Sequence, residues 1–365
     1  MSGLVPMHGG QLRQISERFH IPASQLMDFS ANINPDGPPP AVLSALRTSV
    51  EDASMLTAYP DLEQIALKQS IASYAGVRPE NIAVANGFLP LLISALPALK
   101  VRRCLVPVPA FVEYRRSLAQ AGVEIEPHIL TAGTNFEYDV SHLADALAKG
   151  VHDAVLLANP QNPSGVLTPK DVLLQLVSSC AQRNVTVLVD EAFIDYTPLH
   201  SLTADVERFP NLIVFRSVTK FHSIPGLRVA YAVANEIIAR ALSAFLPPWP
   251  ITTLASCAAA SALADHAFAT LSRLHNVQRR ARLKAALDAI CIRTYPAAAN
   301  FLLLRLPEGV SAEQFWRRMI VEHHMVLRDC SNYEALPPGH FRTAVHTEEK
   351  NEQLVRAVAA SLANS

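Results

Sequence analysis

Residues 153–193 read DAVLLANPQNPSGVLTPKDVLLQLVSSCAQRNVTVLVDEAF. Two short apolar runs, at 154–158 and 185–189, flank an amphipathic stretch at 169–183. Short apolar runs are the length of buried strands, and about ten to fifteen amphipathic residues are typical of a helix. A strand, a helix and a second strand in this order predict a crossover unit whose two strands are parallel.

The same alternation continues on both sides of this stretch. We expect further strands at residues 81–85, 104–107, 124–129, 212–216 and 228–233. Helical patterns lie between them at residues 61–74, 89–98, 111–121 and 141–148. Alternating strands and helices form a mostly parallel sheet whose two faces are covered by helices. The sequence therefore predicts an α/β fold around a mostly parallel seven-stranded sheet.

The pattern changes after about residue 234, which predicts a second, smaller α+β domain. Its expected elements are helices at 236–245, 252–265 and 269–290, a strand at 299–304, a helix at 312–322, and a last strand and helix that end near residue 363. We divide the chain into an N-terminal arm at 1–40, a large domain at 41–245 and a small domain at 246–365. The run FLPPWP is a stiff junction between the domains. We expect the Gly- and Pro-rich start to form an arm or loop rather than part of a core.

Composition narrows the class of protein. The 365 residues carry 31 Lys and Arg against 32 Asp and Glu, and 50% are hydrophobic. This balance excludes intrinsic disorder and argues against a nucleic-acid partner, which would need a basic surface. The longest apolar stretch, 89–99, is too short for a membrane span, and the start has no signal-peptide pattern. Five scattered cysteines, never in CxxC spacing, favour a cytoplasmic protein with reduced thiols and no metal site.

Lys220 is the first residue that indicates chemistry. It lies in RSVTKFHSIPGLR (216–228), directly after a buried strand pattern. Open α/β folds bind their ligands at the carboxyl ends of the strands. A lysine placed there beside Ser217, Thr219 and Arg228 suits a phosphorylated carbonyl compound, because the amine can form a Schiff base and the other groups can hold the phosphate. Neighbouring positive charge also lowers the pKa of the amine.

Two further residues are expected near Lys220. Asp190 follows the strand pattern 185–189, so its carboxylate emerges at the same sheet edge and can pair with a protonated ring nitrogen. Asn162 lies between prolines in ANPQNPSG (158–165), where its amide can hydrogen-bond a phenolic oxygen. Alone, such an aspartate is more often a turn former or helix cap, and such a loop is a Pro-rich turn. Together with Lys220, they predict a binding site for a ring compound.

Taken in order, NPQNPSG, DEAF and SVTK, with the arginine of GLR eight residues beyond the lysine, resemble the pyridoxal-phosphate enzymes of the aspartate aminotransferase superfamily, fold type I. The resemblance covers essentially the whole chain. It implies that Lys220 binds the cofactor covalently and that Asp190 pairs with the ring nitrogen. It also implies that Asn162 bonds the ring O3′ and that Phe111 stacks on the ring face. The implied cofactor is pyridoxal 5′-phosphate, whose ring acts as an electron sink.

The resemblance also assigns the cofactor's phosphate. The groups implied are the side chains of Ser217, Thr219 and Arg228 and the backbone N–H groups of Phe88 and Leu89. Tyr59, in TAYPD, resembles the tyrosine that reaches the neighbouring subunit's cofactor, which implies an obligate homodimer with the active site at the subunit interface. The chain departs from the family pattern twice. Phe193 stands where many relatives have Tyr, and the phosphate loop at 87–90 lacks a side-chain hydroxyl.

Two arginines near the C-terminus, Arg328 in VLRDCSNY and Arg342 in HFRTAV, lie across an expected strand, turn and strand. A pair of arginines that faces a site forms a bidentate clamp for two anionic groups, such as a carboxylate and a phosphate. Because the chain has 24 arginines, two surface arginines would be the default interpretation without further support.

That support is a resemblance to the family of L-threonine O-3-phosphate decarboxylases of cobalamin assembly. The motifs that carry it are HGG at 8–10, DFSANINPDGPP at 28–39, DEAFIDY at 190–196, SIPGLR at 223–228 and RDCSNY at 328–333. The resemblance implies that His8 and Arg328 bind the substrate phosphate and that Arg342 binds the carboxylate. The loop that carries Asn32 would close over the amino acid, and Asn162 would also contact it.

The implied reaction is loss of CO2 from L-threonine O-3-phosphate, which gives (R)-1-amino-2-propanol O-phosphate for cobalamin biosynthesis. The bond held perpendicular to the cofactor ring breaks, so the groups that orient the substrate choose the reaction. The alternatives are a histidinol-phosphate-type aminotransferase and a decarboxylase of another phosphoamino acid such as O-phosphoserine, which His346 in place of a family arginine suggests. A non-catalytic binding subunit is a third alternative, suggested by the degenerate loop at 87–90.

Overall fold

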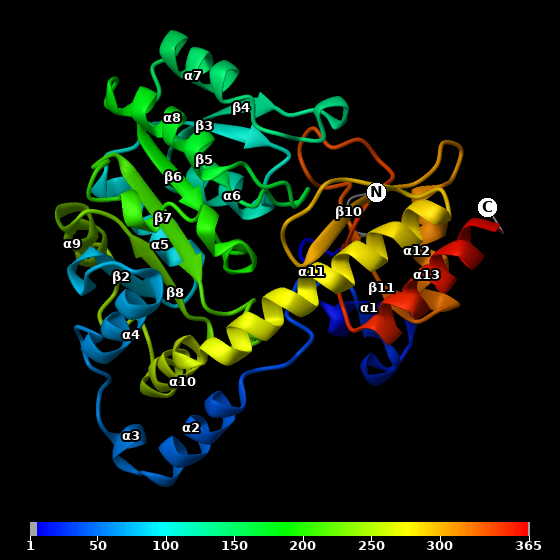
Figure 1. The fold of residues 1–365 in the computed structure, drawn as a ribbon, viewed down its shortest axis with the longest axis horizontal. Helices are drawn as coiled ribbons and strands as arrows, with labels where there is room; N and C mark the ends of the chain where they lie inside the picture. Colours follow the sequence, from blue (N-terminus) through cyan, green and yellow to red (C-terminus); the bar gives the residue numbers. More distant parts are fainter. Residues whose placement is uncertain (1–5, 364–365) are drawn as a thin grey trace.

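A seven-stranded sheet forms the centre of the larger part of the molecule (Figure 1). In the computed structural model, which describes residues 6–363, the strands lie in the order β2-β8-β7-β6-β5-β3-β4. Their bounds are β2 Ile82–Ala85, β3 Arg103–Val108, β4 Glu124–Ile129, β5 Ala154–Ala158, β6 Thr186–Asp190, β7 Leu212–Ser217 and β8 Ala230–Val233. Only β8 runs antiparallel to its neighbours. The predicted α/β fold is therefore confirmed.

Helices cover both faces of this sheet, as the alternating pattern predicts. One face packs against α2 Pro40–Glu51, α4 Ile65–Ala75, α7 Val140–Lys149, α8 Lys170–Ala181 and α10 Thr253–Ala264. The other packs against α5 Phe88–Ala98, α6 Val112–Gln120 and α9 Glu236–Ala244. The strands between them are buried on both faces, which explains their continuous apolar runs.

Two predicted elements begin later than the sequence pattern suggests. We expected β8 from residue 228, but Arg228 has a left-handed φ of 56° and the strand starts at Ala230. We expected α4 from residue 61, but Gln64 has a φ of 53°, and a regular helix starts only after it. In both cases a left-handed residue ends the preceding turn.

The smaller part of the molecule contains a four-stranded antiparallel sheet in the order β12-β13-β10-β9. Its strands are β9 Arg293–Thr294, β10 Phe301–Arg305, β12 Arg328–Asp329 and β13 His340–Ala344. Helices α12 Ala312–Val321 and α13 Glu348–Ala363 pack against it. The long helix α11, His266–Ala289, runs from α10 toward α13 and so links the two parts (Figure 1). The domain boundaries at residues 40 and 245 stay predictions.

The N-terminal segment differs from the arm or loop that we expected. Residues Leu12–Phe19 form the helix α1, and β1 (Met27–Asp28) pairs with β11 (Met325–Val326). Ile15 and Phe29 are fully buried in the core of the smaller part. Leu12, Ile15 and Phe19 recur at helical spacing, which places them on one face of α1. A short apolar face thus anchors the segment that the Gly and Pro content made us treat as a loop.

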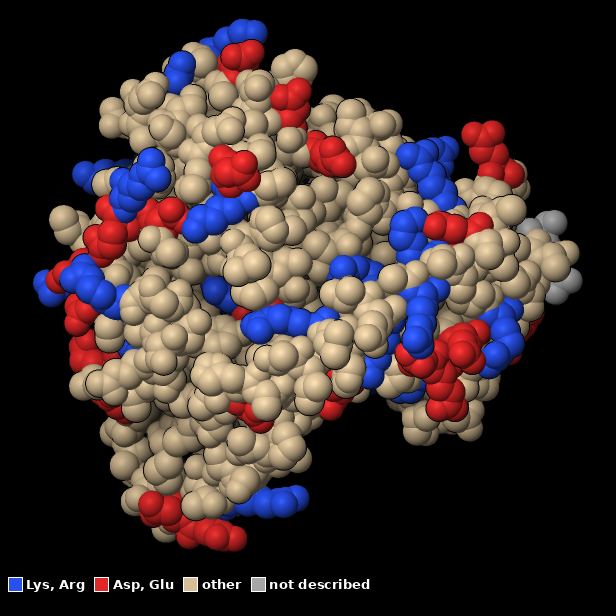
Figure 2. Space-filling view, in the orientation of Figure 1, with Lys and Arg blue, Asp and Glu red and all other residues tan. Residues whose placement is uncertain are grey.

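Charged residues of both signs mix on the face in view, and few lie over α10 (Figure 2). In residues 6–363, no single helix is long and apolar enough to cross a membrane. The bent pair α10 and α11 meets the length and composition test only when the two helices are taken together, and they meet at 70°.

Candidate active site

A cavity of about 500 Å³ lies between the N-terminal segment, the loops at the carboxyl ends of the large sheet and the strands β12 and β13. Nine of the predicted site residues line it: His8, Asn32, Phe111, Asn162, Thr219, Lys220, Arg228, Arg328 and Arg342. Residues that are hundreds of positions apart in the sequence therefore meet in one place, at the sheet edge where an α/β fold places its ligands.

Lys220 lies in the turn after β7 and faces the cavity. Its Nζ lies 5.1 Å from the centre of the Phe193 ring. Burial lowers the pKa of this lysine because the ammonium group loses hydration. The negative charge of Asp190 opposes that change, whereas the positive charges of Arg228 and Arg342 reinforce it. A lowered pKa keeps more of the ε-amino group in its neutral, nucleophilic form.

Asp190 ends β6, the neighbour of β7, so its carboxylate emerges at the same sheet edge as Lys220. Its Oδ1 accepts a hydrogen bond from the N–H of Ala192 (2.9 Å), and its Oδ2 accepts one from the hydroxyl of Tyr114 (2.6 Å). Burial raises the pKa of Asp190, while the charge of Lys220 and the two hydrogen bonds favour the carboxylate. The site thus holds a buried carboxyl group that a positively charged partner would stabilise as an anion.

The start of α5 meets the side chain of Arg228. Gly87, the residue before α5, has a φ of +96°, and a Cβ added to it would lie 2.8 Å from the Arg228 guanidinium. Only glycine leaves room for this contact. The hydroxyls of Ser217 and Thr219 lie 2.7 Å apart at the end of β7. A helix N-terminus, a guanidinium and two hydroxyls are the groups that bind phosphate in proteins.

Arg342, on β13, connects several walls of the cavity. Its Nη1 donates to Oδ1 of Asn162 (2.5 Å) and to the hydroxyl of Tyr333 (3.3 Å), and its Nη2 donates to the carbonyl of Ser30 (3.3 Å). The side chain is buried, and its Nε has no hydrogen-bond partner within the described residues. Every partner is neutral, so the positive charge of Arg342 is not balanced by these contacts.

Arg328 lies directly opposite Arg342 in the register of β12 and β13. Cross-strand partners project from the same face of a sheet, so the two guanidinium groups share one side. Arg328 is also buried, and it donates to the carbonyls of Met7 (2.7 Å) and Asp329 and to Oδ1 of Asn332 (2.7 Å). In the described part of the chain neither arginine pairs with a carboxylate. Two buried like charges side by side are unfavourable until an anion binds them.

The HGG segment packs closely on the loop that carries Ser30. The N–H of Gly10 donates to Oγ of Ser30 (2.9 Å), and a Cβ added to Gly9 would lie 2.0 Å from the Ser30 carbonyl oxygen. This contact brings His8 to the cavity, where its Nε2 lies 2.9 Å from Oε1 of Glu113. The close backbone contact explains the glycine at position 9, and the left-handed φ of +80° explains the glycine at position 10.

Asn32 lies on the cavity wall and is only 6% exposed. Its Oδ1 is buried and has no hydrogen-bond partner among residues 6–363. Buried polar groups are nearly always paired, so an acceptor left free on a cavity wall indicates that a ligand donates to it.

Five predicted site residues do not line the cavity: Asp190, Ser217, Phe88, Leu89 and Tyr59. The first four lie at the ends of β6 and β7 and at the start of α5, whereas Tyr59 is 79% exposed and stacks on Trp249 at 4.7 Å. His346 is absent from the cavity wall as well, and its Nε2 lies 2.8 Å from the carbonyl oxygen of Asp28, which does line the cavity. The suggestion that His346 tunes the anion pocket stays a prediction.

The sequence and the fold both match known proteins. The family model described as aminotransferase class I and II matches residues 24–358. This chain belongs to the aminotransferase class I and II family. The threonine-phosphate decarboxylase of Salmonella typhimurium is 33% identical, over 96% of this chain and 95% of that protein. This relative confirms that the motifs indicated the right family.

Two solved structures resemble this member of the aminotransferase class I and II family closely. The histidinol-phosphate aminotransferase from Clostridium acetobutylicum is 29% identical, with a TM-score of 0.86, and covers 93% of this chain and 100% of that one. The L-threonine-O-3-phosphate decarboxylase from Porphyromonas gingivalis is 26% identical, with a TM-score of 0.79, over 92% and 99% of the two chains. The similarity in fold therefore extends to proteins with two different names.

Enzymes of the aminotransferase class I and II family use pyridoxal phosphate, and the residues of this cavity fit it. Lys220 offers an amine with a lowered pKa, and Asp190 offers a buried carboxyl group on the neighbouring strand. Gly87 leaves open a space beside Arg228 that a Cβ would fill, at the N-terminus of α5. These groups would hold the aldehyde, the ring nitrogen and the phosphate of the cofactor, in that order.

Sequence reasoning missed two tyrosines of this site. Tyr114 bonds to Asp190 and follows Phe111 by three residues, one helical turn, a spacing that could have indicated it. Tyr333 accepts a hydrogen bond from Arg342 and ends the RDCSNY motif, to which we assigned no role for the tyrosine. Each hydroxyl is hydrogen-bonded to a residue that the motifs did identify, namely Asp190 or Arg342.

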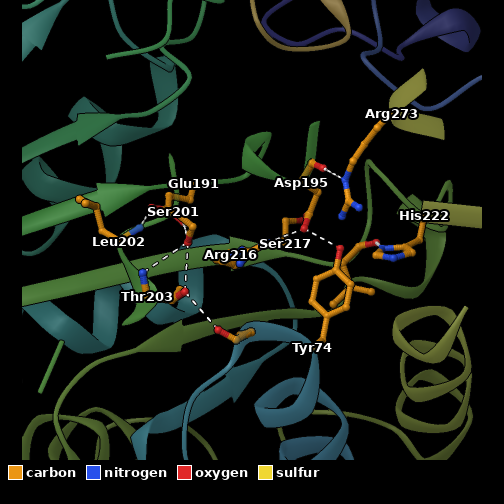
Figure 3. Close-up of polar contacts among 12 residues, drawn as sticks. Tyr74, Glu191, Asp195, Ser201, Leu202, Thr203, Arg216, Ser217, His222 and Arg273 are labelled. Carbon is orange, nitrogen blue, oxygen red and sulfur yellow. Dashed lines mark hydrogen bonds and ion pairs between the residues drawn. The ribbon is translucent and has the colours of Figure 1, made fainter. Parts of the chain in front are cut away.

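A buried polar network lies behind the site (Figure 3). Asp195 accepts hydrogen bonds from Tyr74 of α4 (2.8 Å) and from Arg216 of β7, and its carbonyl accepts one from Arg273 of α11 (2.7 Å). Figure 3 shows Tyr74 and Arg273 reaching Asp195 from opposite sides. Glu191, next to Asp190, accepts from Ser201 and Leu202, and burial raises its pKa to about 7. The network ties the DEAFIDY segment (190–196) to α4, β7 and α11.

We expect Asp195→Ala to lower the free energy of unfolding by about 3–5 kcal/mol, because it leaves the buried Arg216 without its carboxylate. The matched variant Tyr74→Phe removes one hydrogen bond to the same carboxylate and should cost less, about 1.5–3 kcal/mol. Urea or thermal unfolding of the two variants and the wild type measures the difference. If Tyr74→Phe lowers the free energy of unfolding as much as Asp195→Ala does, the ion pair between Asp195 and Arg216 is not the main stabilising contact of the network.

Proposed function

We propose that this protein is a pyridoxal-phosphate-dependent decarboxylase that converts L-threonine O-3-phosphate to (R)-1-amino-2-propanol O-phosphate for cobalamin biosynthesis. The proposal rests on the aminotransferase class I and II fold and on the threonine-phosphate decarboxylase relatives. A bifunctional cobalamin-biosynthesis protein of Leptospira interrogans, 27% identical over 97% of this chain, supports the pathway.

One observation supports the substrate class more than any other. Arg328 and Arg342 are buried on one face of the small sheet, opposite each other in register, and only neutral groups contact them. A ligand with two separate anionic groups would balance both charges. A phosphorylated amino acid has such groups in its phosphate and its carboxylate. Arg328 donates a hydrogen bond to the carbonyl of Met7, the residue before His8, so His8 lies on the Arg328 side of the cavity. We therefore assign the phosphate to His8 and Arg328 and the carboxylate to Arg342.

When bound, pyridoxal phosphate supplies an electron sink for the electron pair left by the broken bond. We assign Lys220, Asp190, Asn162 and Phe111 to its aldehyde, ring nitrogen, O3′ and ring face. The phosphate is assigned to Ser217, Thr219, Arg228 and the backbone N–H groups of Phe88 and Leu89. Asp190 would hold a proton at the ring nitrogen, and Lys220, in its ammonium form, would deliver to the substrate's α-carbon the proton that replaces the lost CO2.

The chain's own groups choose the reaction by orienting the substrate. Arg342 would hold the carboxylate on the side of Asn162 and Ser30, which it already contacts. The free Oδ1 of Asn32 is placed to accept a hydrogen bond from the substrate. With phosphate and carboxylate both anchored, one orientation of the α-carbon would be selected, and that orientation decides which of its bonds is broken.

Product analysis tests the proposal. We expect the protein loaded with pyridoxal phosphate to release CO2 from L-threonine O-3-phosphate and to form the phosphorylated amine, detected by mass spectrometry. O-phospho-L-serine, which lacks one methyl group, is a comparison substrate because one methyl group is worth only about 1–3 kcal/mol of discrimination. L-Threonine, which lacks the phosphate, is the other comparison substrate. The second candidate, a histidinol-phosphate-type aminotransferase, is favoured by the high TM-score of the Clostridium acetobutylicum enzyme. No CO2, with a keto product formed only when 2-oxoglutarate is present, would establish that candidate.

We also propose a cytoplasmic homodimer whose subunits complete each other's sites. Exposed apolar side chains lie on α2, on the segment that connects α2 to the start of α4, and near the junction that follows α9: Leu43, Val50, Leu56, Tyr59, Leu62, Ile65, Phe245 and Trp249. Tyr59 is exposed there, as a residue that reaches the neighbouring subunit must be. Sedimentation should give twice the chain mass of 39.7 kDa, and Tyr59→Phe should weaken cofactor binding.

Gly9→Ala tests the contribution of the N-terminal segment. The added Cβ would lie 2.0 Å from the Ser30 carbonyl oxygen, so the segment must shift and carry His8 away from the cavity. We expect the KM for the phosphorylated substrate to rise by about tenfold or more, the equivalent of about 1.4 kcal/mol, without loss of the bound cofactor. The control is Gly133→Ala, whose Cβ would meet only Oγ1 of Thr131, at 3.7 Å. If the KM of Gly9→Ala is within twofold of the wild-type value, the N-terminal segment does not contribute to substrate binding.

A further inference from the structure

We propose that Tyr114 is a positioning residue that keeps Asp190 in its carboxylate form, and thereby keeps the proton on the ring nitrogen of the cofactor. The inference depends on the pairing of Asp190 with that nitrogen, and it holds for a decarboxylase and for an aminotransferase alike. It deepens the proposed function without depending on which substrate is used.

The first support is the contact itself. The hydroxyl of Tyr114 donates to Oδ2 of Asp190 at 2.6 Å, the short distance typical of a hydrogen bond to an ionised acceptor. Tyr114 is 1% exposed and Asp190 is 8% exposed, so water cannot readily replace either partner. A donor removed from a buried carboxylate leaves an acceptor unpaired, which costs more than the loss of an exposed hydrogen bond.

The second support is that Tyr114 can act only as a donor to this carboxylate. Burial and the negative charge of Asp190 raise the pKa of the phenol well above its ordinary value. The hydroxyl therefore keeps its proton over the pH range in which proteins are stable. Phe88 and Phe111 enclose the ring, with ring centres 5.7 and 5.6 Å away, and fix the direction of the hydroxyl. The aromatic packing therefore positions a permanent donor at Oδ2.

The third support is the balance of forces on Asp190. Burial favours its neutral acid, whereas the N–H of Ala192, the hydroxyl of Tyr114 and the charge of Lys220 favour the anion. When the amine of Lys220 is bound to the cofactor, Asp190 no longer faces a free lysine ammonium group. The hydrogen bonds from Ala192 and Tyr114 to Asp190 remain. If Tyr114 is removed, Asp190 becomes more basic and competes with the ring nitrogen for their shared proton. The electron-withdrawing capacity of the ring then falls.

Tyr114→Phe is the direct test, because a phenyl ring keeps the packing and removes only the donor. With the enzyme loaded with pyridoxal phosphate labelled with 15N in the ring, we expect the 15N resonance to move toward the value of the unprotonated ring. We expect kcat to fall by about tenfold to a hundredfold, the range of one hydrogen bond to a charged group, while KM changes less than threefold.

The matched control is Tyr138→Phe. Tyr138 is also a buried tyrosine beside the sheet, but its hydroxyl donates to the carbonyl of Ala158 (2.9 Å) and not to Asp190. This variant should leave the 15N resonance unchanged. If Tyr114→Phe shows the wild-type resonance and kcat, or if Tyr138→Phe shifts the resonance equally, the inference is wrong.

A third variant keeps the test valid if Tyr114→Phe does not fold. Incorporation of 3-fluorotyrosine at position 114 leaves the shape of the side chain almost unchanged and makes its hydroxyl a stronger donor. We expect the 15N resonance to move in the opposite direction, toward the protonated ring, and a shift in the same direction as in Tyr114→Phe would overturn the inference. Because the readout needs only bound cofactor, failure of the decarboxylation proposal leaves it intact, and CO2 release with an unchanged resonance would refute the Tyr114 role alone.

Discussion

Lys220→Ala is expected to abolish turnover, with kcat lowered by at least about 10⁴-fold, because the proposed function assigns to this one residue both the covalent bond to the cofactor and the proton transfer. Among the described residues that line the cavity, Lys220 is the sole lysine, so no neighbour can take over its amine. Its lowered pKa makes it the amine best suited to react with an aldehyde near neutral pH. Release of CO2 and the absorbance of the bound cofactor measure the loss.

The control for this prediction is Lys220→Arg, which keeps a positive charge opposite Asp190 but has no amine that can condense with an aldehyde. It should be as inactive as Lys220→Ala and should bind the cofactor only reversibly. Borohydride reduction of the wild type, followed by peptide mapping, should find the pyridoxyl group on Lys220 and on no other lysine. A reduced adduct elsewhere in the chain would falsify the assignment of the whole site.

The sheet and its ligand edge could be predicted from sequence because buried strands leave long apolar runs. Lys220, Asp190 and Asn162 each follow such a run, and parallel strands bring their carboxyl ends to one edge. The predicted ranges 124–129 and 154–158 coincide with β4 and β5. Helical spacing from Phe111 could have indicated that Tyr114 lies near the site, but the contact of its hydroxyl with Asp190 depends on how α6 packs over the sheet.

The N-terminal segment could not be predicted in the same way. Its apolar face is short, and Gly9 and Gly10 made a loop the simplest interpretation. The structure explains both features, because Ile15 anchors α1 in the small core while Gly9 packs against the Ser30 carbonyl. Long-range contacts of this kind leave no local pattern in the sequence.

The first turn of α6 shows how a few neighbouring residues can organise a site. Phe111 lines the cavity, Glu113 contacts His8, and Tyr114 bonds to Asp190. Arg115 forms a bidentate ion pair with Glu334 of the loop after β12, at 2.7 and 2.9 Å. One helical turn therefore contributes to the cavity wall and contacts the N-terminal segment, Asp190 and the C-terminal loop. A shift of α6 would disturb all four together.

The substrate clamp should show a trade-off between function and stability. Replacing either Arg328 or Arg342 by Gln is expected to lower kcat/KM for the phosphorylated amino acid by about 30-fold to several thousand-fold, because each removes a buried charge paired with an anion in the complex. In the absence of ligand the same variants should gain about 0.2–1 kcal/mol of stability, since two like charges opposite each other on β12 and β13 repel.

The two arginines should differ in which anion they recognise. With Arg328→Gln we expect the preference for L-threonine O-3-phosphate over L-threonine to collapse, because the phosphate loses its partner. With Arg342→Gln the affinity for the product amine, which has no carboxylate, should change far less than the affinity for the substrate. Isothermal titration with the substrate and with the product amine, together with kcat/KM for both amino acids, distinguishes these outcomes.

Arg305→Gln is the matched control for both variants. Arg305 lies opposite Arg293 in the same small sheet, so it is also one of a cross-strand pair of arginines, but it does not line the cavity. Its replacement should relieve a like-charge pair and leave kcat/KM unchanged. If Arg305→Gln lowers kcat/KM as much as Arg328→Gln and Arg342→Gln, the loss reflects a general disturbance of the small sheet. If all three variants gain stability and only Arg328→Gln and Arg342→Gln lose activity, the repulsion between Arg328 and Arg342 lowers stability but is needed to bind a doubly anionic ligand.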